Sequence, residues 1–331
     1  MPSLSHRIKD NFPSSVRLDR YVSEQIKILS RSQIKTRRLK AKINGKDVKH
    51  SHPVKKGDHL ELIWDDTPPF YVVPENIPLE IIYESDRCVV INKAQGMVVH
   101  PGAGNRHGTL VNALMFYKEQ RTENKEQKII NDDRFTQDTC CPRDVKRPWD
   151  ACRPGIVHRL DKDTSGVIIA ALDEEAHAFL SDQFKTRNVR KNYIAIVCGA
   201  PKEVKGRIET FIARDPKDRK RFTVSADGRH AVTFYKVIKQ WQNHSLLLLR
   251  PKTGRTHQLR VHLRFTGCPI LGDPLYGKND KKFPDASLML HSKTLAVTLP
   301  DEKEQRVFSA SLPERFNVII KKLNNTGGAD G

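Results

Sequence analysis

The sequence predicts an α+β protein made of two folded units. Its 331 residues are about twice the usual length of one domain. Apolar residues recur at helical spacing in some segments and alternate in others, without the regular strand–helix order of a doubly wound sheet. Residues 65–69, Asp-Asp-Thr-Pro-Pro, break both patterns, and we expect a linker over residues 67–76.

The first unit is expected over residues 16–66, after a flexible start at residues 1–15. Apolar residues at helical spacing predict a helix over 18–29, and Ser30 with Gln33 three positions later predicts the start of a second helix. Asn44-Gly45 predicts a tight turn between short strands, and alternation over 59–64 predicts another strand. These elements describe a small α+β domain.

The second, larger unit is expected over residues 77–323. Its predicted strands lie at 81–83, 88–92, 167–172, 193–197, 231–238, 246–249 and 294–299, and its predicted helices at 110–117, 174–185, 256–266 and 313–323. Residues 118–152 are polar and lack clean periodicity, so we expect a partly disordered surface insertion there. Residues 324–331 are expected to form a flexible tail.

The charge of the chain indicates a polyanionic partner. Lys and Arg number 58 and Asp and Glu 39, which gives a net charge of +19. Nucleic acid is the first candidate because each neutralised phosphate releases counterions, whereas the alternative is a basic surface that only aids solubility. Residues 31–56 hold ten basic residues and one acidic residue, Asp47, and such clustering favours phosphate binding. The predicted second helix carries the candidate RNA-binding residues Arg31, Lys35, Arg37 and Arg38.

Several other classes of protein do not fit the sequence. No stretch approaches the roughly 18–20 apolar residues of a membrane-spanning helix, and residues 1–15 lack the apolar core of a secretory signal, so we expect a cytoplasmic protein. The six cysteines form no C-x-x-C pair. Cys140, Cys141 and Cys152 with His158 could surround a metal, but adjacent cysteines are poor tetrahedral ligands, and we favour free thiols.

Two segments carry the candidate chemistry. In residues 155–166 a loop with several charged side chains leads into the apolar strand 167–172, and Leu160 with this strand is expected to draw Asp161 inward. In residues 253–263, Gly254 is expected to allow a tight turn that places Arg255 at the mouth of a helix. Isolated Asp and Arg residues usually form solvated surface pairs, which is the default interpretation for Asp163, Asp173 and Asp215 and a weaker alternative for Asp161.

These segments resemble the RluA/RluD family of RNA pseudouridine synthases, preceded by an S4 RNA-binding domain. The resemblance spans about residues 75–320 and is closest to the synthases that act on bacterial large-subunit ribosomal RNA. It is carried by His158-Arg159-Leu160-Asp161 with residues 162–166, and by residues 92–96, 99–105, 185–193, 253–263 and 290–291. The S4 resemblance rests on residues 17–19, 30–32 and 57–58.

The resemblance implies a fold, an activity and roles for particular residues. The fold is a mixed, mainly antiparallel central sheet behind the S4-like domain. Asp161 is the implied catalytic residue, Arg255 its salt-bridge partner, and Tyr193 the ring that stacks on the target uracil. Arg159 is the implied residue that enters the RNA duplex and fills the gap of the flipped base. The implied reaction needs no cofactor and no metal.

The chemistry fits these side chains. Pseudouridine formation breaks the N1–C1′ bond of uridine, turns the uracil and rejoins it through C5, so no redox change or phosphate transfer occurs. An ionised carboxylate can either attack C1′ or remove the C2′ proton, and the sequence leaves both routes open. A neighbouring arginine would offset the effect of burial on the pKa of that carboxylate.

Other features bear on the choice of RNA. Arg219, Lys220 and Arg221 lie in a second basic run, 214–221, which is expected to be a flexible loop that contacts RNA, the alternative being an exposed turn. Ala94 stands where the family pattern has proline, the 118–152 segment is long, and the S4-like unit lacks a glycine after its second helix. A tRNA-directed synthase and a catalytically idle RNA-binding or ribosome-assembly factor are the alternatives, and we expect a monomer.

Overall fold

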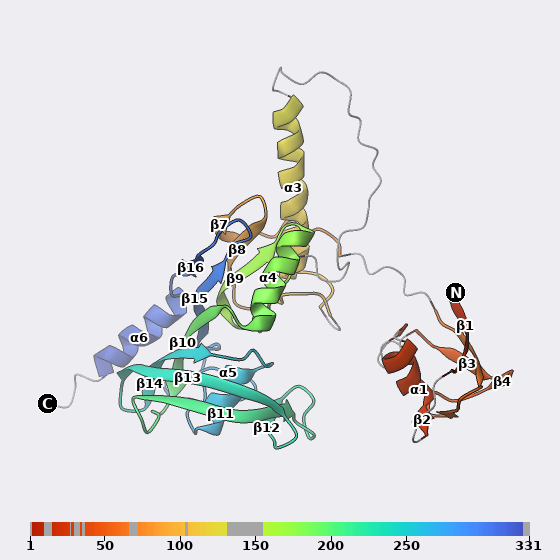
Figure 1. The fold of residues 1–331 in the computed structure, drawn as a ribbon. Helices are drawn as coiled ribbons and strands as arrows, with labels where there is room; N and C mark the ends of the chain where they lie inside the picture. Colours follow the sequence, from red (N-terminus) through yellow and green to blue (C-terminus); the bar gives the residue numbers. More distant parts are fainter. Residues whose placement is uncertain are drawn as a thin grey trace. The chain divides into compact units, whose positions relative to one another are not determined.

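The computed structural model describes residues 2–9, 15–26, 28–29, 34, 37–65, 72–102, 105–130 and 155–326. The chain divides into two compact units, Met1–Phe70 and Tyr71–Gly331, and Figure 1 shows the elements of each. Arg31 and Lys35, the cysteines at 140, 141 and 152, and most of the predicted second helix lie outside the described residues. Among the described residues, no helix combines the length and the apolar character needed to cross a membrane.

The first unit is a small α+β domain built on a four-stranded sheet. The strand order is β1-β6-β3-β4, and a two-stranded sheet pairs β2 with β5. The strands are β1 (Ser3–Arg7), β2 (Val16–Arg17), β3 (Lys40–Ile43), β4 (Lys46–Asp47), β5 (Pro53–Val54) and β6 (His59–Ile63). Helix α1 (Leu18–Tyr21) continues into the π-helical turn η1 (Val22–Ile26), and it buries Leu18 and Tyr21 against Leu60 and Leu62 of β6.

The expectation of a flexible start at residues 1–15 is wrong for its first part. All five residues of β1 pair antiparallel with β6, from Ser3 opposite Ile63 to Arg7 opposite His59. Ile8, which follows the strand, is 1% exposed and belongs to the core of the unit. The pairing comes from backbone hydrogen bonds to the edge of β6, which the polar sequence of β1 does not reveal.

The sequence has no glycine after the second predicted helix, and in the structure Arg38 takes the position where a glycine is expected. Arg38 adopts a left-handed backbone with φ of 46°, and the N–H of Leu39 donates to the carbonyl of Ile34 at 3.0 Å. This is the hydrogen bond that closes the last turn of a helix when a left-handed residue ends it. An arginine therefore occupies the conformation that glycine usually supplies.

The second unit is built on a ten-stranded mixed sheet. The order is β12-β11-β13-β14-β10-β15-β9-β8-β7, with β16 also paired to β15, and only the β15–β9 pair is parallel among the described strands. The strands are β7 (Glu80–Glu84), β8 (Cys88–Lys93), β9 (Ser165–Ala171), β10 (Arg190–Cys198), β11 (Lys205–Arg214), β12 (Phe222–Val224), β13 (Arg229–Gln240), β14 (His244–Pro251), β15 (Leu290–Thr298) and β16 (Gln305–Ser309). The predicted α+β class and the mainly antiparallel sheet are confirmed.

Among the described residues of this unit, four helices accompany the sheet: α3 (Leu110–Ile130), α4 (Glu174–Thr186), α5 (Gln258–Phe265) and α6 (Glu314–Thr326). The prediction that α3 ends at Tyr117 is wrong, because the helix continues through the first part of the predicted insertion to Ile130. Residues 118–130 are rich in Glu, Lys and Gln, which favour helix without an apolar stripe. Residues 131–152 lie outside the described residues, and α6 runs to Thr326, so it includes the first residues of the predicted tail.

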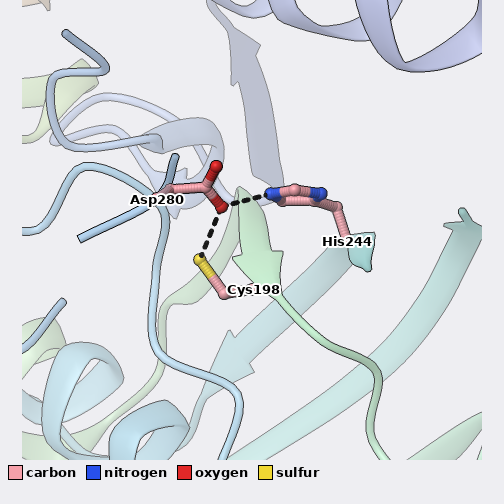
Figure 2. Close-up of side chains that lie close together, drawn as sticks. All are labelled: Cys198, His244 and Asp280. Atoms are coloured by element: carbon pink, nitrogen blue, oxygen red, sulfur yellow. Dashed lines mark hydrogen bonds and ion pairs between the residues drawn. The ribbon is translucent and has the colours of Figure 1, made fainter. Parts of the chain in front are cut away.

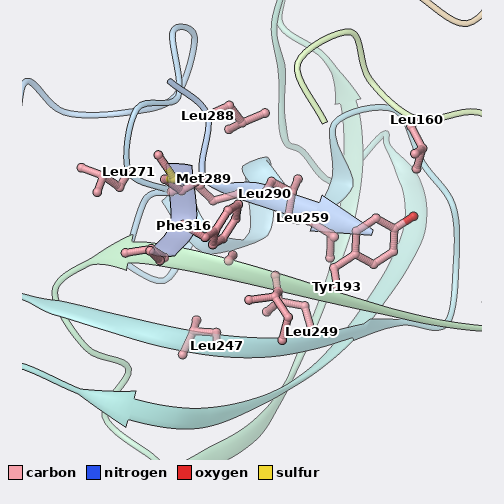
Figure 3. Packing of buried hydrophobic residues seen from close by; sticks show 14 of the residues in the cluster. Leu160, Tyr193, Leu247, Leu249, Leu259, Leu271, Leu288, Met289, Leu290 and Phe316 are labelled. Atoms are coloured by element: carbon pink, nitrogen blue, oxygen red, sulfur yellow. The ribbon is translucent and has the colours of Figure 1, made fainter. Parts of the chain in front are cut away.

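The centre of the sheet is buried on both faces. Every residue of β9 is buried, and one core cluster under the sheet joins Ile168, Ile196, Leu249 and Phe316. The adjoining ends of β10 and β14 are connected to the loop 277–283 by Asp280, whose carboxylate accepts from His244 and Cys198 (Figure 2). At the opposite end of β10, Tyr193 lies at the margin of the apolar cluster that also contains Leu160 and Leu259 (Figure 3).

Candidate active site

A cavity of about 430 Å³ opens at this end of the sheet. It is bounded by the loop before β9, the end of α4, the start of β10 and the loop between β14 and α5. The predicted residues Arg159, Asp161, Tyr193 and Arg255 all line it. Residues that are far apart in the sequence are thus brought to one site, as the sequence predicts.

Two glycines shape the loop that carries Asp161. Gly155 has φ of +77°, and a Cβ there would lie 2.3 Å from the carbonyl oxygen of Ala171. Gly166 has φ of +111°, and a Cβ there would lie 2.2 Å from the carbonyl oxygen of Ser292. Both positions combine a left-handed backbone with close approach to a neighbouring strand, which a side chain would prevent.

His158 fixes the middle of this loop. Its Nε2 accepts a hydrogen bond of 3.1 Å from the N–H of Ile169, and its ring stacks on Phe184 with 4.3 Å between centroids. Burial, with a smaller contribution from Lys191, lowers the pKa of His158 to about 3. The imidazole is therefore neutral at physiological pH, as an acceptor of a backbone N–H must be.

The buried side chain of Lys93 stabilises this loop through hydrogen bonds to backbone carbonyls. It is 1% exposed, and its Nζ donates to the carbonyl oxygens of Ala94, Met97 and Lys162 at 2.8, 2.8 and 3.0 Å. An ammonium group supplies three N–H donors, one for each carbonyl. Burial lowers the pKa of Lys93 to about 7. The sequence analysis assigned no role to Lys93. A lysine at the end of an apolar strand, here Cys88–Lys93, is the pattern that indicates such a buried charged residue.

Asp161 contacts an arginine, but not the predicted one. Its Oδ2 lies 3.5 Å from Nη1 of Arg260, and the exposed fractions of the two side chains are 18% and 4%. The predicted ion pair with Arg255 is wrong, because the Nε of Arg255 donates to the carbonyl of His230 at 3.0 Å. Arg255 precedes α5 and bonds to the backbone of β13, whereas Arg260 lies within the helix and is buried.

Arg260 is itself held by a second carboxylate. Its Nε and Nη2 donate to the two oxygens of Asp273 at 2.7 and 2.6 Å, a bidentate pair in which the Asp273 side chain is fully buried. Asp273 Oδ1 also accepts from the N–H groups of Leu275 and Tyr276. The guanidinium is thereby fixed in one orientation, with Nη1 directed to Asp161. Arg260 lies in the segment 253–263 that the sequence singles out, yet neither Arg260 nor Asp273 was predicted as a site residue.

Tyr193 forms an apolar wall of the cavity. Its side chain extends from β10 into the cluster that contains Leu160 and Leu259 (Figure 3). Burial raises the pKa of Tyr193 to about 12, so its hydroxyl stays neutral at physiological pH. A neutral aromatic ring beside a carboxylate suits the face of a planar base.

The charge of the cavity is strongly positive. Asp161 is the one carboxylate among the described residues that line it, whereas the cations at the cavity are Arg159, Lys185, Arg187, Lys191, Lys252, Arg255 and Arg260. Arg159 is exposed, and Lys191 Nζ lies 5.9 Å from the centre of the Phe184 ring. Such a rim attracts the phosphates of a nucleic acid and leaves one anionic side chain at the centre.

The second basic run is a structured hairpin rather than a flexible loop. Between β11 and β12, Arg214 Nη1 donates to the carbonyl of Arg219 at 2.7 Å, and the N–H of Asp215 donates to the carbonyl of Arg221 at 3.0 Å. Arg219 and Lys220 are exposed, whereas Arg221 pairs with Asp218. The hairpin leads into Phe222, whose ring meets the His257 ring edge-on at the start of α5.

Comparison with known proteins agrees with this geometry. Residues 87–265, more than half of the chain, match a family described as RNA pseudouridylate synthase. The chain is 40% identical over 328 residues to "Ribosomal large subunit pseudouridine synthase D" of Borreliella burgdorferi, covering 96% of this chain and 93% of that protein. A protein of the same description from Zymomonas mobilis is 36% identical over 326 residues, covering 93% of each chain.

A solved structure shows the same fold. The human RNA pseudouridylate synthase domain containing 4 protein superposes with a TM-score of 0.55 at 27% identity, covering 74% of this chain and 93% of that one. The mixed sheet and its basic cavity are thus those of an RNA-modifying isomerase, which converts uridine to pseudouridine. The chain belongs to the RNA pseudouridylate synthase family, and the predicted family and activity are confirmed.

Proposed function

We propose that this enzyme forms pseudouridine in large-subunit ribosomal RNA and that Asp161 is its catalytic carboxylate. The observation that carries the proposal is the contact of Asp161 with Arg260, itself fixed by Asp273, inside a cavity with a cationic rim. The relatives described as ribosomal large-subunit synthases support the choice of RNA. Such a substrate lies in the cytoplasm, where we expect the enzyme to act.

The chemistry requires a carboxylate that is ionised beside the ribose. The guanidinium of Arg260 lies 3.5 Å from Asp161 Oδ2, and its bidentate bond to Asp273 keeps this cation in place beside the carboxylate. In the reaction the N1–C1′ bond breaks, the detached uracil turns, a C5–C1′ bond forms, and the C5 proton leaves. Asp161 either attacks C1′ or takes the C2′ proton, and both routes start from the same ionised group.

The target base must leave the RNA stack to reach this carboxylate. Extrusion costs a few kcal/mol, and stacking on the neutral ring of Tyr193 offsets part of that cost. To Arg159, which is exposed and lines the cavity, we assign entry into the space that the base vacates. We assign RNA-phosphate contacts to three residues of the hairpin, Arg219, Lys220 and Arg221. We also propose that the first unit is an S4-like RNA-binding domain, whose phosphate contacts are made by Arg31, Lys35, Arg37 and Arg38.

The test of catalysis is the release of tritium from RNA labelled at C5 of uridine. Asp161→Asn removes the anion and should abolish release, whereas Asp163→Asn is a matched control on the same loop that does not line the cavity and should retain most of the rate. Retained activity in Asp161→Asn, in a folded protein, would contradict the role of this carboxylate. Equal loss in both variants would point to general disruption of the loop.

The test of substrate is a map of pseudouridines in a strain that lacks the gene. We expect sites in large-subunit ribosomal RNA to lose the modification and to recover it with the wild-type gene but not with Asp161→Asn. Loss confined to transfer RNA would overturn the ribosomal assignment and leave the catalytic one intact.

A further inference from the structure

Three donor atoms of different chemistry converge at the end of β10 and β14 that lies away from the cavity. They belong to Cys198, His244 and Asp280, and all lie within 4.8 Å of one another (Figure 2). The His244 side chain is 4% exposed and that of Asp280 15%. None of the three lines the catalytic cavity, so the reaction does not account for the cluster.

The fold fixes each member of the cluster. Cys198 and His244 are directly opposed in the β10–β14 pairing, and the N–H of Cys198 donates to the carbonyl of Pro269 at 2.9 Å. Asp280 Oδ1 accepts from the N–H groups of Lys282 and Phe283 at 2.9 and 3.1 Å. This leaves Oδ2 free to accept from His244 Nε2 at 2.8 Å and from the thiol of Cys198 at 3.8 Å.

We propose that Cys198, His244 and Asp280 bind a divalent cation of the zinc class, with water as the fourth ligand. Thiolate sulfur, imidazole nitrogen and carboxylate oxygen are the donors that Zn²⁺ prefers. Tetrahedral bonds of about 2.0–2.3 Å place donor atoms roughly 3.3–3.8 Å apart. The sulfur–oxygen separation of 3.8 Å lies at the upper end of this range, and the imidazole and carboxylate must part by about 0.5 Å to reach it. The sulfur and the imidazole nitrogen, which lie within 4.8 Å of each other, must settle within the same range when the cation binds.

The charges and protons balance on binding. The Cys198 thiol releases its proton to water and the His244 proton moves to Nδ1, so a dication meets one thiolate and one carboxylate and the complex is neutral. Burial, with the charge of Asp280, raises the pKa of free Cys198 to about 11, and the cation itself displaces the proton. Lys278 lies near enough to favour the thiolate. The alternative is a hydrogen-bonded latch that binds no metal.

Such a site is structural. It would join the loop 277–283 to the ends of two central strands without reaching Asp161. We therefore expect metal loading to raise thermal stability and to leave the rate of tritium release unchanged, since binding to the native state alone stabilises it.

The test uses the full chain with Cys140→Ser, Cys141→Ser and Cys152→Ser as background, because these thiols lie outside the described residues and could bind the same metals. After treatment with a chelator, the protein is titrated with Co²⁺. We expect one Co²⁺ per chain and a thiolate-to-cobalt charge-transfer band.

Three further variants in this background decide the assignment. Cys198→Ser should lose the band, and Asp280→Asn should weaken Co²⁺ binding at least about tenfold, since even outer-sphere partners contribute that much. Cys88→Ser, which alters a buried cysteine outside the cluster, should keep both the band and the affinity. Circular dichroism checks that each variant is folded. The absence of a thiolate band in the background protein, or a band that survives Cys198→Ser, would overturn the proposal. The cluster would then be a set of hydrogen bonds that binds no metal.

Discussion

Arg260 lies between two carboxylates, with Asp273 bound by two hydrogen bonds of 2.6 and 2.7 Å and Asp161 at 3.5 Å. The inner carboxylate is fully buried and the outer one borders the cavity. The short bonds set the orientation of the guanidinium, and the long contact is the one that is free to change when substrate binds. A planar, forked cation is needed for both contacts at once.

Arg260→Lys should therefore lower kcat by about a hundredfold or more, because an ammonium cannot bind Asp273 bidentately and also face Asp161. Arg255→Lys is the matched control, because Arg255 lines the same cavity but contacts a backbone carbonyl. It should change KM more than kcat. Steady-state tritium release separates the two variants, and a larger loss of kcat in Arg255→Lys would contradict the pairing.

Lys93 gives stability an unusual dependence on pH. The ordinary pKa of lysine, 10.5, applies to the unfolded chain, and burial lowers the folded value to about 7. Between these values the unfolded chain binds the extra proton, so the free energy of unfolding should rise with pH. Below pH 7 both states hold the proton and the cost of burying the charge is fully present.

Lys93→Met removes this titration. Denaturant unfolding of both proteins is measured at several pH values. Between pH 7 and 10.5 the free energy of unfolding of the wild type should rise relative to that of the variant, by up to about 1.4 kcal/mol per pH unit. Parallel curves across that window would mean that Lys93 titrates normally. The variant should also be less active, because the carbonyl of Lys162 in the Asp161 loop loses its donor.

Gly155→Ala tests the backbone that supports the catalytic loop. The new Cβ would lie 2.3 Å from the Ala171 carbonyl oxygen, in addition to the strain of a positive φ. Gly267→Ala is the control, since Gly267 has φ of +81° and nothing within 4 Å of such a Cβ. We expect the control to lose about 1–2 kcal/mol and Gly155→Ala clearly more, measured by denaturant unfolding. Equal losses would show that the loop relaxes without cost.

The exposed cations of the β11–β12 hairpin should contribute to RNA affinity through charge. Arg219→Ala with Lys220→Ala should weaken binding and reduce the slope of log affinity against log salt by about 0.7–0.9 for each phosphate that is no longer neutralised. Lys303→Ala is the control, because Lys303 is exposed in the turn between β15 and β16, away from the cavity residues. Filter binding at several salt concentrations gives the slopes, and an unchanged slope in the double variant would exclude a phosphate interaction at this hairpin.

The sequence was sufficient for the central strands and for the position of Asp161. The strands β8, β9 and β10 each contain a continuous apolar run. The loop before β9 carries charged side chains, and glycines with positive φ stand at its start and just after its end. The arginine was not predictable in the same way. The motif contains both Arg255 and Arg260, and the choice depends on where α5 begins, which is at Gln258 rather than at the predicted residue 256.

Other differences have the same origin in tertiary context. Residues 118–130 form helix through intrinsic propensity, with Arg121 bonded to Asp86 at the far end of the β7–β8 hairpin. Their polar character hides the helix from a search for apolar periodicity. The carboxylate of Asp273 was overlooked because its importance comes from Arg260, thirteen positions earlier in the chain.

The pairing of β1 with β6 has a practical consequence for anyone who prepares this protein. Removing the first nine residues as a disposable leader would strip the small sheet of its outer strand and bare the backbone of β6. Unpaired strand edges recruit other chains, so a shortened protein of this kind is expected to self-associate. Purification tags are better placed so that Ser3–Arg7 stays intact.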